Sequence, residues 1–213
     1  MRTFITIILL FLQTQIFCQT NKELLILYEI NKIRSNPKSY ISKAEEYINT
    51  QNFILKKYED SKFTINTTSY SGNSNSNNDM VNVKKTTGKD VHIQNIKAAE
   101  DLINVLDTIT PMDTLMFDSL MYKITKSHGE YLKSVDKTGH YGPKGQTVFD
   151  RFNSYEVSEN CGTSLIGLMV DSGIPGFGHR YNILNPKWNY ISIYYIIDHP
   201  SWGDSYMIQN FKQ

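Results

Sequence analysis

Four residues in the C-terminal half of the chain carry side chains that could bind a metal ion or transfer protons. They are His140 in the segment GHYG, Glu159 in SEN, Asp171 in VDSG and His179 in GHR. Two histidines and two carboxylates suit a borderline ion such as zinc. They equally suit general acid–base chemistry, because histidine titrates near neutrality. The four residues are far apart along the chain, so their spacing alone leaves both chemistries open.

The stretch SGIPGFGHRYNILNP, residues 172–186, has unusual turn chemistry around His179. Its three glycines free the backbone, and its first proline imposes a fixed bend. We expect this loop to present His179 from a tight turn, anchored by Ile183 and Leu184 of a short helix that follows. The alternative is that His179 only caps its own helix.

The N-terminal part of the chain is predicted to be mainly helical. Apolar residues recur at helical spacing over residues 23–35, 38–58, 93–110 and 112–135. We expect helices to end at Asn36–Pro37 and at Pro111. Asp113 or Thr114 is the expected N-cap of the last helix. His128 lies on the apolar stripe of the last helix and should point inward or towards a cleft. A core histidine with a satisfied hydrogen bond is the alternative.

Residues 66–90 have a different character, being polar and rich in Asn and Ser. Such a segment buries too little apolar surface to offset the entropy of ordering it, so we predict a flexible insert. The alternating asparagines from Asn73 are similar to a calcium-binding loop. However, Asn78 stands where that loop needs glycine and Lys84 where it needs glutamate, which excludes calcium there.

Two strands are predicted near the C-terminus, over residues 188–197 and 205–211, because both segments are rich in Ile, Tyr and Phe with partial alternation. Residues 198–204 should form the hairpin between them. Trp188 and Trp202 are expected to pack in the core and in the hairpin. Helices followed by strands, without regular alternation, predict an α+β domain with a mostly antiparallel sheet.

The first 18 residues have the layout of a secretory signal peptide. A basic Arg2 precedes an apolar core over residues 4–12, which is too short to span a bilayer. We expect cleavage after Cys18 and a secreted, extracellular protein of residues 19–213, long enough for one well-buried domain. A lipoprotein anchored through Cys18 is the alternative.

The composition argues against partners that are recruited by bulk charge. The chain has 22 Lys and Arg against 21 Asp and Glu, for a net charge of +1. This balance provides no basic surface for a nucleic-acid backbone or an anionic membrane. We therefore expect no nucleic-acid partner. We also expect no transmembrane span and a monomer.

Cys161 is the one cysteine that remains after the predicted leader. A small buried hydrophobe is the expected role for it. The alternative is a nucleophile in a Cys–His–Asp set for acyl transfer, with His140 or His179 and with Asp171. A zinc peptidase of the usual kind is not expected, because the chain has no His-Glu-x-x-His motif.

Taken in order, several segments resemble the CAP superfamily of cysteine-rich secretory proteins, antigen 5 and plant pathogenesis-related proteins. The segments are LYEINKIRSNP, LMYKITKSHGEYL, TGHYGPKG with FDRF, SENCG, VDSGIPGFGHRYNILNP and YMIQNF. The bacterial-type, SCP-like extracellular branch, which lacks the disulfides, is the most similar. The resemblance runs from about Glu23 to Phe211, interrupted by the insert. It implies an α-β-α sandwich with a central, mostly antiparallel sheet flanked by helices.

The resemblance also implies a cleft lined by two histidines and two acidic residues, which in several relatives binds zinc or a similar divalent ion. The residues that match the family motifs are His140, Glu159, Asn160, His179 and Arg180. The second acidic residue departs from the pattern. Animal and plant members have a glutamate, preceded by tryptophan, on the intervening helix, and Asp171 is the nearest candidate here.

For function we expect an extracellular binding or signalling module rather than an enzyme, with a groove that takes Zn²⁺ or a similar ion. The expected groove residues are His128, His140, Glu159, Asn160, Asp171, His179 and Arg180. Because the resemblance links relatives to sterol or lipid binding, protease-like activity and host interaction, a lipid, sterol or protein is the expected partner. One alternative is a metal-dependent hydrolase that uses His140 and His179, with Glu159 as general base. Another is a groove with only a structural role.

Overall fold

The computed structural model describes residues 19–60, 66–68 and 85–213. The predicted signal peptide, its cleavage site and the lipid-anchor alternative lie outside the described residues, as does most of the predicted insert. Among the helices that are described, none is both long and apolar enough to cross a membrane.

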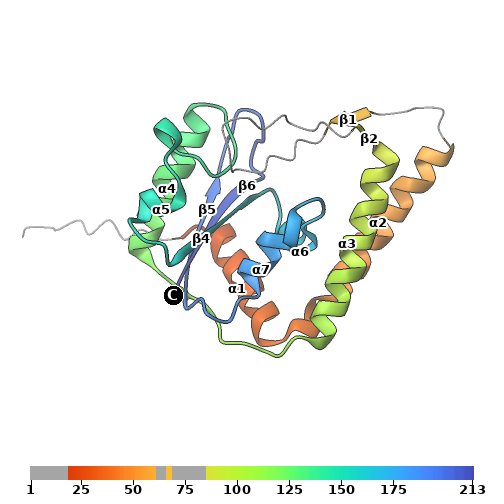
Figure 1. Ribbon diagram of the computed structural model, residues 1–213, viewed down its shortest axis with the longest axis horizontal. Coiled ribbons are helices and arrows are strands. Elements are labelled where there is room, and N and C mark those ends of the chain that lie inside the picture. The colour runs from red at the N-terminus through yellow and green to blue at the C-terminus, as the bar shows by residue number, and fades with distance from the viewer. Residues whose placement is uncertain (1–18, 61–65, 69–84) are drawn as a thin grey trace, which may run out of the picture.

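A four-stranded sheet forms the centre of the molecule (Figure 1). Its strands, in spatial order, are β3 (Met116–Phe117), β5 (Tyr190–Ile196), β6 (Tyr206–Lys212) and β4 (Val157–Gly162). β3 pairs parallel with β5, whereas the β5–β6 and β6–β4 pairs are antiparallel. The predicted C-terminal hairpin and the mostly antiparallel sheet are therefore confirmed. β4 is an edge strand, which matters for the site below.

One face of the sheet packs against α4 (Ser119–Ser134). Tyr194, Ile196 and Ile208 of the sheet share a buried cluster with side chains of this helix. Gly129 lets α4 approach closely, because a Cβ atom there would lie 2.4 Å from the Tyr194 ring.

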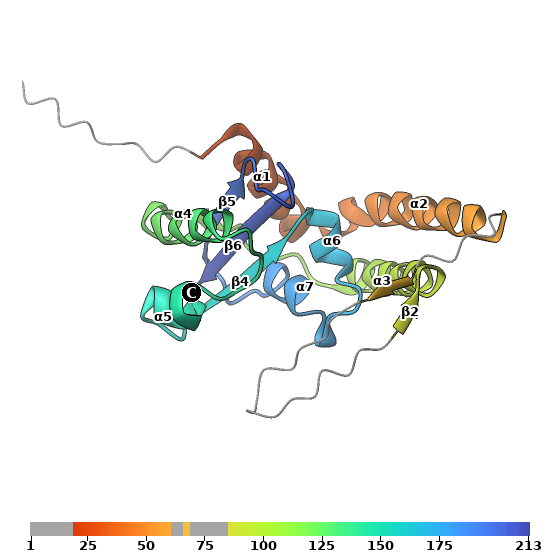
Figure 2. The same cartoon turned by 90° about the horizontal axis from the view of Figure 1, so that it is seen from above.

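The opposite face packs against three shorter helices, so that helices lie on both sides of the strands in both views (Figures 1 and 2). These helices are α1 (Asn21–Ser35), α6 (Leu165–Val170) and α7 (Gly178–Ile183). Ile191, Ile193 and Phe211 point from the sheet into this second cluster. The long helices α2 (Ile41–Asp60) and α3 (Gly88–Thr108) pair with each other and extend this layer. The α+β class and the α-β-α sandwich are thus confirmed.

α1 begins with a capping box between Thr20 and Glu23. The Glu23 carboxylate accepts from the Thr20 backbone N–H at 2.7 Å, and the Thr20 hydroxyl accepts from the Glu23 N–H at 3.3 Å. The helix ends directly before Asn36, as predicted from the following proline. A 3₁₀ turn, Pro37–Tyr40, then leads into α2.

Both ends of the segment over residues 66–90, for which a flexible insert is predicted, form regular structure. β1 (Asn66–Thr68) pairs antiparallel with β2 (Lys85–Thr87), and α3 starts at Gly88 rather than at residue 93. Threonines in both strands favour extended backbone, since β-branched side chains suit strands. Asp90 lies in the first turn of α3, where a carboxylate is favoured by the helix dipole.

The predicted start of the helix over residues 112–135 was also wrong. Met116 and Phe117 form β3, and the helix α4 begins only at Ser119, capped by Asp118 rather than by Asp113 or Thr114. The backbone upstream is held in the sheet, because the N–H groups of Met116 and Asp118 donate to the Asn189 and Ile191 carbonyls. Pairing with β5 therefore overrode the helical spacing of this segment.

The Asp118 cap supports a first prediction. Its carboxylate accepts from the Leu120 and Met121 N–H groups at 2.8 and 3.0 Å. We expect Asp118→Ala to lower the free energy of unfolding by about 1 kcal/mol, measured by chemical denaturation. Ser119→Ala, at an exposed neighbouring position, is the control and should change stability by less than about 0.5 kcal/mol. Equal effects of the two substitutions would contradict the assignment of the cap.

Candidate functional site

The structure brings His140 and His179 together. Their ring centroids lie 6.2 Å apart, and the ring planes differ by 22°. His140 lies in the loop that follows α4, and His179 is the second residue of α7. Because α4 and α7 cover opposite faces of the sheet, the two histidines approach each other from opposite sides.

The alternation of side chains along edge strand β4 places a different residue beside each histidine. Successive side chains of a strand point to opposite faces. Glu159 opposes Asn210 of β6, on the face of α4, and Asn160 opposes Gln209, on the face of α7. Glu159 thus contacts the His140 ring, and its neighbour Asn160 contacts the His179 backbone.

His140 is held by Glu159. The His140 Nδ1 atom lies 3.2 Å from Glu159 Oε1, and the carboxylate is buried. Its other oxygen, Oε2, accepts from Arg151 at 2.5 Å and from Asn210 at 2.9 Å. Burial opposes ionisation of Glu159, but the bond with His140 and the charge of Arg151 outweigh it and lower the pKa of this carboxyl group. Glu159 is therefore ionised at neutral pH.

Arg151 is a site residue that sequence reasoning missed. It lies on the short helix α5 (Val148–Phe152), beside β4, and also donates to the His140 backbone carbonyl at 2.8 Å. Its side chain is only 6% exposed. It lies in the FDRF segment that contributed to the family resemblance, and this was the only available signal.

His179 is held by Asp171 in a matching way. Asp171 Oδ1 lies 2.7 Å from the His179 Nδ1 atom, and Oδ2 accepts from the His179 backbone N–H at 2.8 Å. Asp171 is buried and ends α6 in a left-handed conformation, with φ 53°. Because both of its oxygens face residue 179, Asp171 lies behind the imidazole and orients it.

The loop before His179 is the tight turn that its composition predicts. Gly176 has φ +72°, a conformation that favours glycine, and Phe177 follows at φ 51°. Ile183 and Leu184 are buried and anchor the loop. The His179 ring binds Asp171, and the N-cap residue of α7 is Phe177, which makes no side-chain cap bond.

Asn160 and Arg180 lie close to His179, and their side chains hold the surrounding strand and helices together. The Asn160 amide donates to the His179 carbonyl at 3.1 Å and accepts from Asn182 at 2.8 Å. The buried Arg180 guanidinium donates to the carbonyl groups of Met169, Val170 and Ala98 and to the carboxylate of Asp101. The structure therefore gives Arg180 a role in joining α3, α6 and α7, in place of the expected groove lining.

His128 lies below the His140 loop, on the face of α4 that contacts the sheet. Its Nε2 atom is 3.2 Å from the Gly139 carbonyl and 3.8 Å from Glu159 Oε1. Burial lowers its pKa, although the charge of Glu159 acts in the opposite direction. A neutral His128 that donates to Gly139 positions the loop that carries His140.

Cys161 lies two residues beyond Glu159 on β4. Its Sγ atom is 3.4 Å from the Gly139 carbonyl and 3.6 Å from His140 Nδ1. The Cys–His–Asp set is not assembled, because Asp171 faces His179 while Cys161 lies beside His140. Burial also raises the pKa of the Cys161 thiol well above its ordinary value, which disfavours a thiolate nucleophile.

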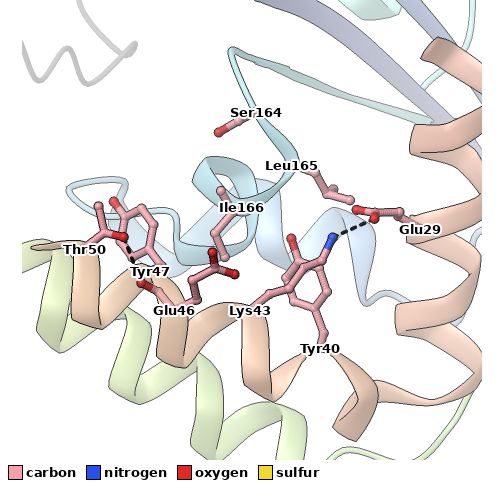
Figure 3. Close-up of a pocket in the computed structure, with 9 residues that line it drawn as sticks. All are labelled: Glu29, Tyr40, Lys43, Glu46, Tyr47, Thr50, Ser164, Leu165 and Ile166. Atoms are coloured by element: carbon pink, nitrogen blue, oxygen red, sulfur yellow. Dashed lines mark hydrogen bonds and ion pairs between the residues drawn. The ribbon is translucent and has the colours of Figure 1, made fainter.

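A separate hollow of about 410 Å³ lies between α1, α2 and the start of α6 (Figure 3). Glu29 and Lys43 form an ion pair of 2.6 Å at its rim, near Tyr40. None of the residues that line it is His140, Glu159, Asp171 or His179.

No protein-family model matches the chain, and a search of curated proteins finds no match. Among solved structures, the chain is similar to an extracellular protein containing an SCP domain from Bacillus anthracis str. Ames. The identity is 20%, with 58% of this chain and 38% of that chain covered and a TM-score of 0.38. It is also similar to an outer surface protein from Borrelia burgdorferi, at 17% identity, with 59% and 94% covered and a TM-score of 0.38.

The fold of this chain is an α-β-α sandwich. The chain spans little more than a third of the Bacillus protein's length.

Proposed function

We propose that this protein is a CAP-type extracellular module whose groove binds a divalent, zinc-like cation between His140 and His179. The observation that supports this proposal is that each histidine turns its Nδ1 atom towards its own buried carboxylate. A histidine that donates from Nδ1 carries its lone pair on Nε2, the atom left for a ligand. Two such histidines face each other here.

The residues present fit such an ion. Imidazole nitrogen is a preferred ligand of zinc, and metal-binding histidines typically donate their other ring N–H to a carboxylate. Glu159 and Asp171 supply that support, whereas Arg151 and Asn160 hold the elements around them. Two protein ligands leave further positions open for an external group.

A binding or signalling role outside the cell is the function that we favour, with residues 19–213 released after Cys18. The expected partner is a lipid, a sterol or a protein that reaches the groove, and the protein acts as a monomer. The near-neutral charge of the chain supports a partner recognised by shape and specific contacts instead of bulk electrostatics.

A metal-dependent hydrolase is the second candidate, and the ionised Glu159 beside His140 is the observation that favours it. In such an enzyme Glu159 would accept a proton from a water molecule in the groove. Arg151 and Asn210 already occupy one oxygen of this carboxylate, which reduces its basicity. Screening peptide and ester substrates with Glu159→Gln as the comparison tests this candidate, since activity that is unchanged in the variant would reject the role of Glu159.

Calorimetric titration of residues 19–213 with Zn²⁺ tests the groove. We expect binding of about one ion per chain, lost in His140→Ala/His179→Ala, because removal of both imidazoles leaves no nitrogen ligand in the groove. His92→Ala is the matched control, since His92 lies on α3, near Gln51. Circular dichroism should show all variants folded. Undiminished binding by the double variant would contradict the proposal, as would no binding by the unmodified protein.

A further inference from the structure

The Nδ1 edge of the His140 ring, which contacts Glu159, also lies against the sulfur atom of Cys161. His140 Nδ1, Glu159 Oε1 and Cys161 Sγ all lie within 4.8 Å of one another. We propose that these three atoms form a site, alternative to the groove between the two histidines, for a thiophilic divalent ion such as Zn²⁺, Co²⁺ or Cd²⁺. This site goes beyond the groove function, because it needs neither His179 nor Asp171.

The two separations that involve His140 match a small tetrahedral site, and Glu159 Oε1 and Cys161 Sγ lie within 4.8 Å of each other. Zinc bonds of about 2.0–2.3 Å place neighbouring ligand atoms of a tetrahedron roughly 3.3–3.8 Å apart. His140 Nδ1 lies 3.2 Å from Glu159 Oε1 and 3.6 Å from Cys161 Sγ. An ion could therefore enter with only small movements of these side chains.

The scaffold presents the three ligands from two directions. Glu159 and Cys161 alternate with Asn160 on β4, so both point to the face of α4. His140 comes from the loop above them, and its half-exposed side chain leaves a route from solvent. Arg151 and Asn210 hold Glu159 Oε2, so that Oε1 is the oxygen turned towards the other two ligands. These contacts would orient the carboxylate as outer partners of a metal site do.

Binding exchanges protons for the ion. The thiol loses its proton to solvent as the metal–sulfur bond forms, and His140 carries its proton on Nε2 when Nδ1 becomes the ligand. Sulfur distinguishes this site from the groove, because thiolate selects thiophilic ions over hard ones. In the groove arrangement, His140 Nδ1 donates a hydrogen bond to Glu159. In the site with Cys161, the lone pair of the same Nδ1 atom binds the ion. The two sites therefore exclude each other, and each chain holds one ion.

Cobalt spectroscopy tests this site without an activity assay. Residues 19–213 contain one cysteine, so a near-ultraviolet thiolate-to-cobalt charge-transfer band can arise only from Cys161. We expect Co²⁺ to produce this band in the unmodified protein and in His179→Ala. The band should be lost in Cys161→Ser and in His140→Ala. Circular dichroism checks that each variant is folded, and Cys161→Ser preserves the approximate size of the side chain.

The possible outcomes separate this inference from the groove function. Cobalt binding without a charge-transfer band, lost in His179→Ala, would overturn the thiolate site and leave the groove function standing. A band that disappears in His179→Ala would show that the site requires His179 and would overturn the proposal. No binding of Co²⁺ or Zn²⁺ by the unmodified protein would overturn both proposals. A band that survives in His179→Ala and vanishes in Cys161→Ser supports the site.

Discussion

Arg34→Ala is expected to lower the free energy of unfolding by about 4 kcal/mol, because it leaves buried carbonyl groups without donors and opens a cavity. Arg34 is fully buried at the end of α1. Its guanidinium donates to the backbone carbonyls of Asp113, Ile183, Asn185 and Trp188, at 2.7 to 3.3 Å. Burial lowers its pKa to about 10, although the charge of Asp113 acts in the opposite direction, so the side chain stays protonated at neutral pH.

Denaturant unfolding followed by circular dichroism measures this effect. Lys32→Ala is the matched control, since Lys32 lies on the same turn of α1 and is exposed. It should change stability by less than about 0.5 kcal/mol. Arg34→Lys should recover only part of the loss, because an ammonium group cannot reach carbonyls in several directions as the planar guanidinium does. A loss below about 1 kcal/mol for Arg34→Ala would show that the carbonyls find other donors.

Asp171→Asn is expected to weaken zinc binding by about 10- to 100-fold while the protein stays folded. The carboxylate accepts from the His179 ring and from its backbone N–H, so it sets both the orientation of the imidazole and the nitrogen left for the ion. An amide has only one accepting oxygen and carries no charge. Asparagine tolerates the left-handed backbone conformation at this position, where φ is 53°, which makes the substitution mild for the fold.

Zinc calorimetry at neutral pH provides the measurement. Asp101→Asn is the control, because Asp101 is a half-exposed partner of Arg180 and does not contact His179. Its zinc affinity should equal that of the unmodified protein. If Asp171→Asn binds zinc as tightly as Asp101→Asn, the carboxylate behind His179 has no part in the site.

Much of the architecture could be predicted from local patterns. The helix before Asn36–Pro37, the hairpin between β5 and β6 and the glycine-rich turn before His179 all follow from spacing, proline and turn residues. These features depend on neighbours only a few residues away. The start of α4 could not be predicted in this way, because the segment around Met116 takes its conformation from pairing with β5, more than 70 residues later.

The sequence by itself determined which residues could do chemistry in the groove, namely two histidines with nearby acidic residues. Only the tertiary structure decided which acid serves which histidine, that Arg180 turns into the scaffold, and that Cys161 lies beside His140. The physical reason is the register of edge strand β4 on β6, a pairing across some 50 residues of chain. Neighbouring residues of any strand point to opposite faces, but the register decides that Glu159 faces α4 and Asn160 faces α7, and no local pattern specifies it.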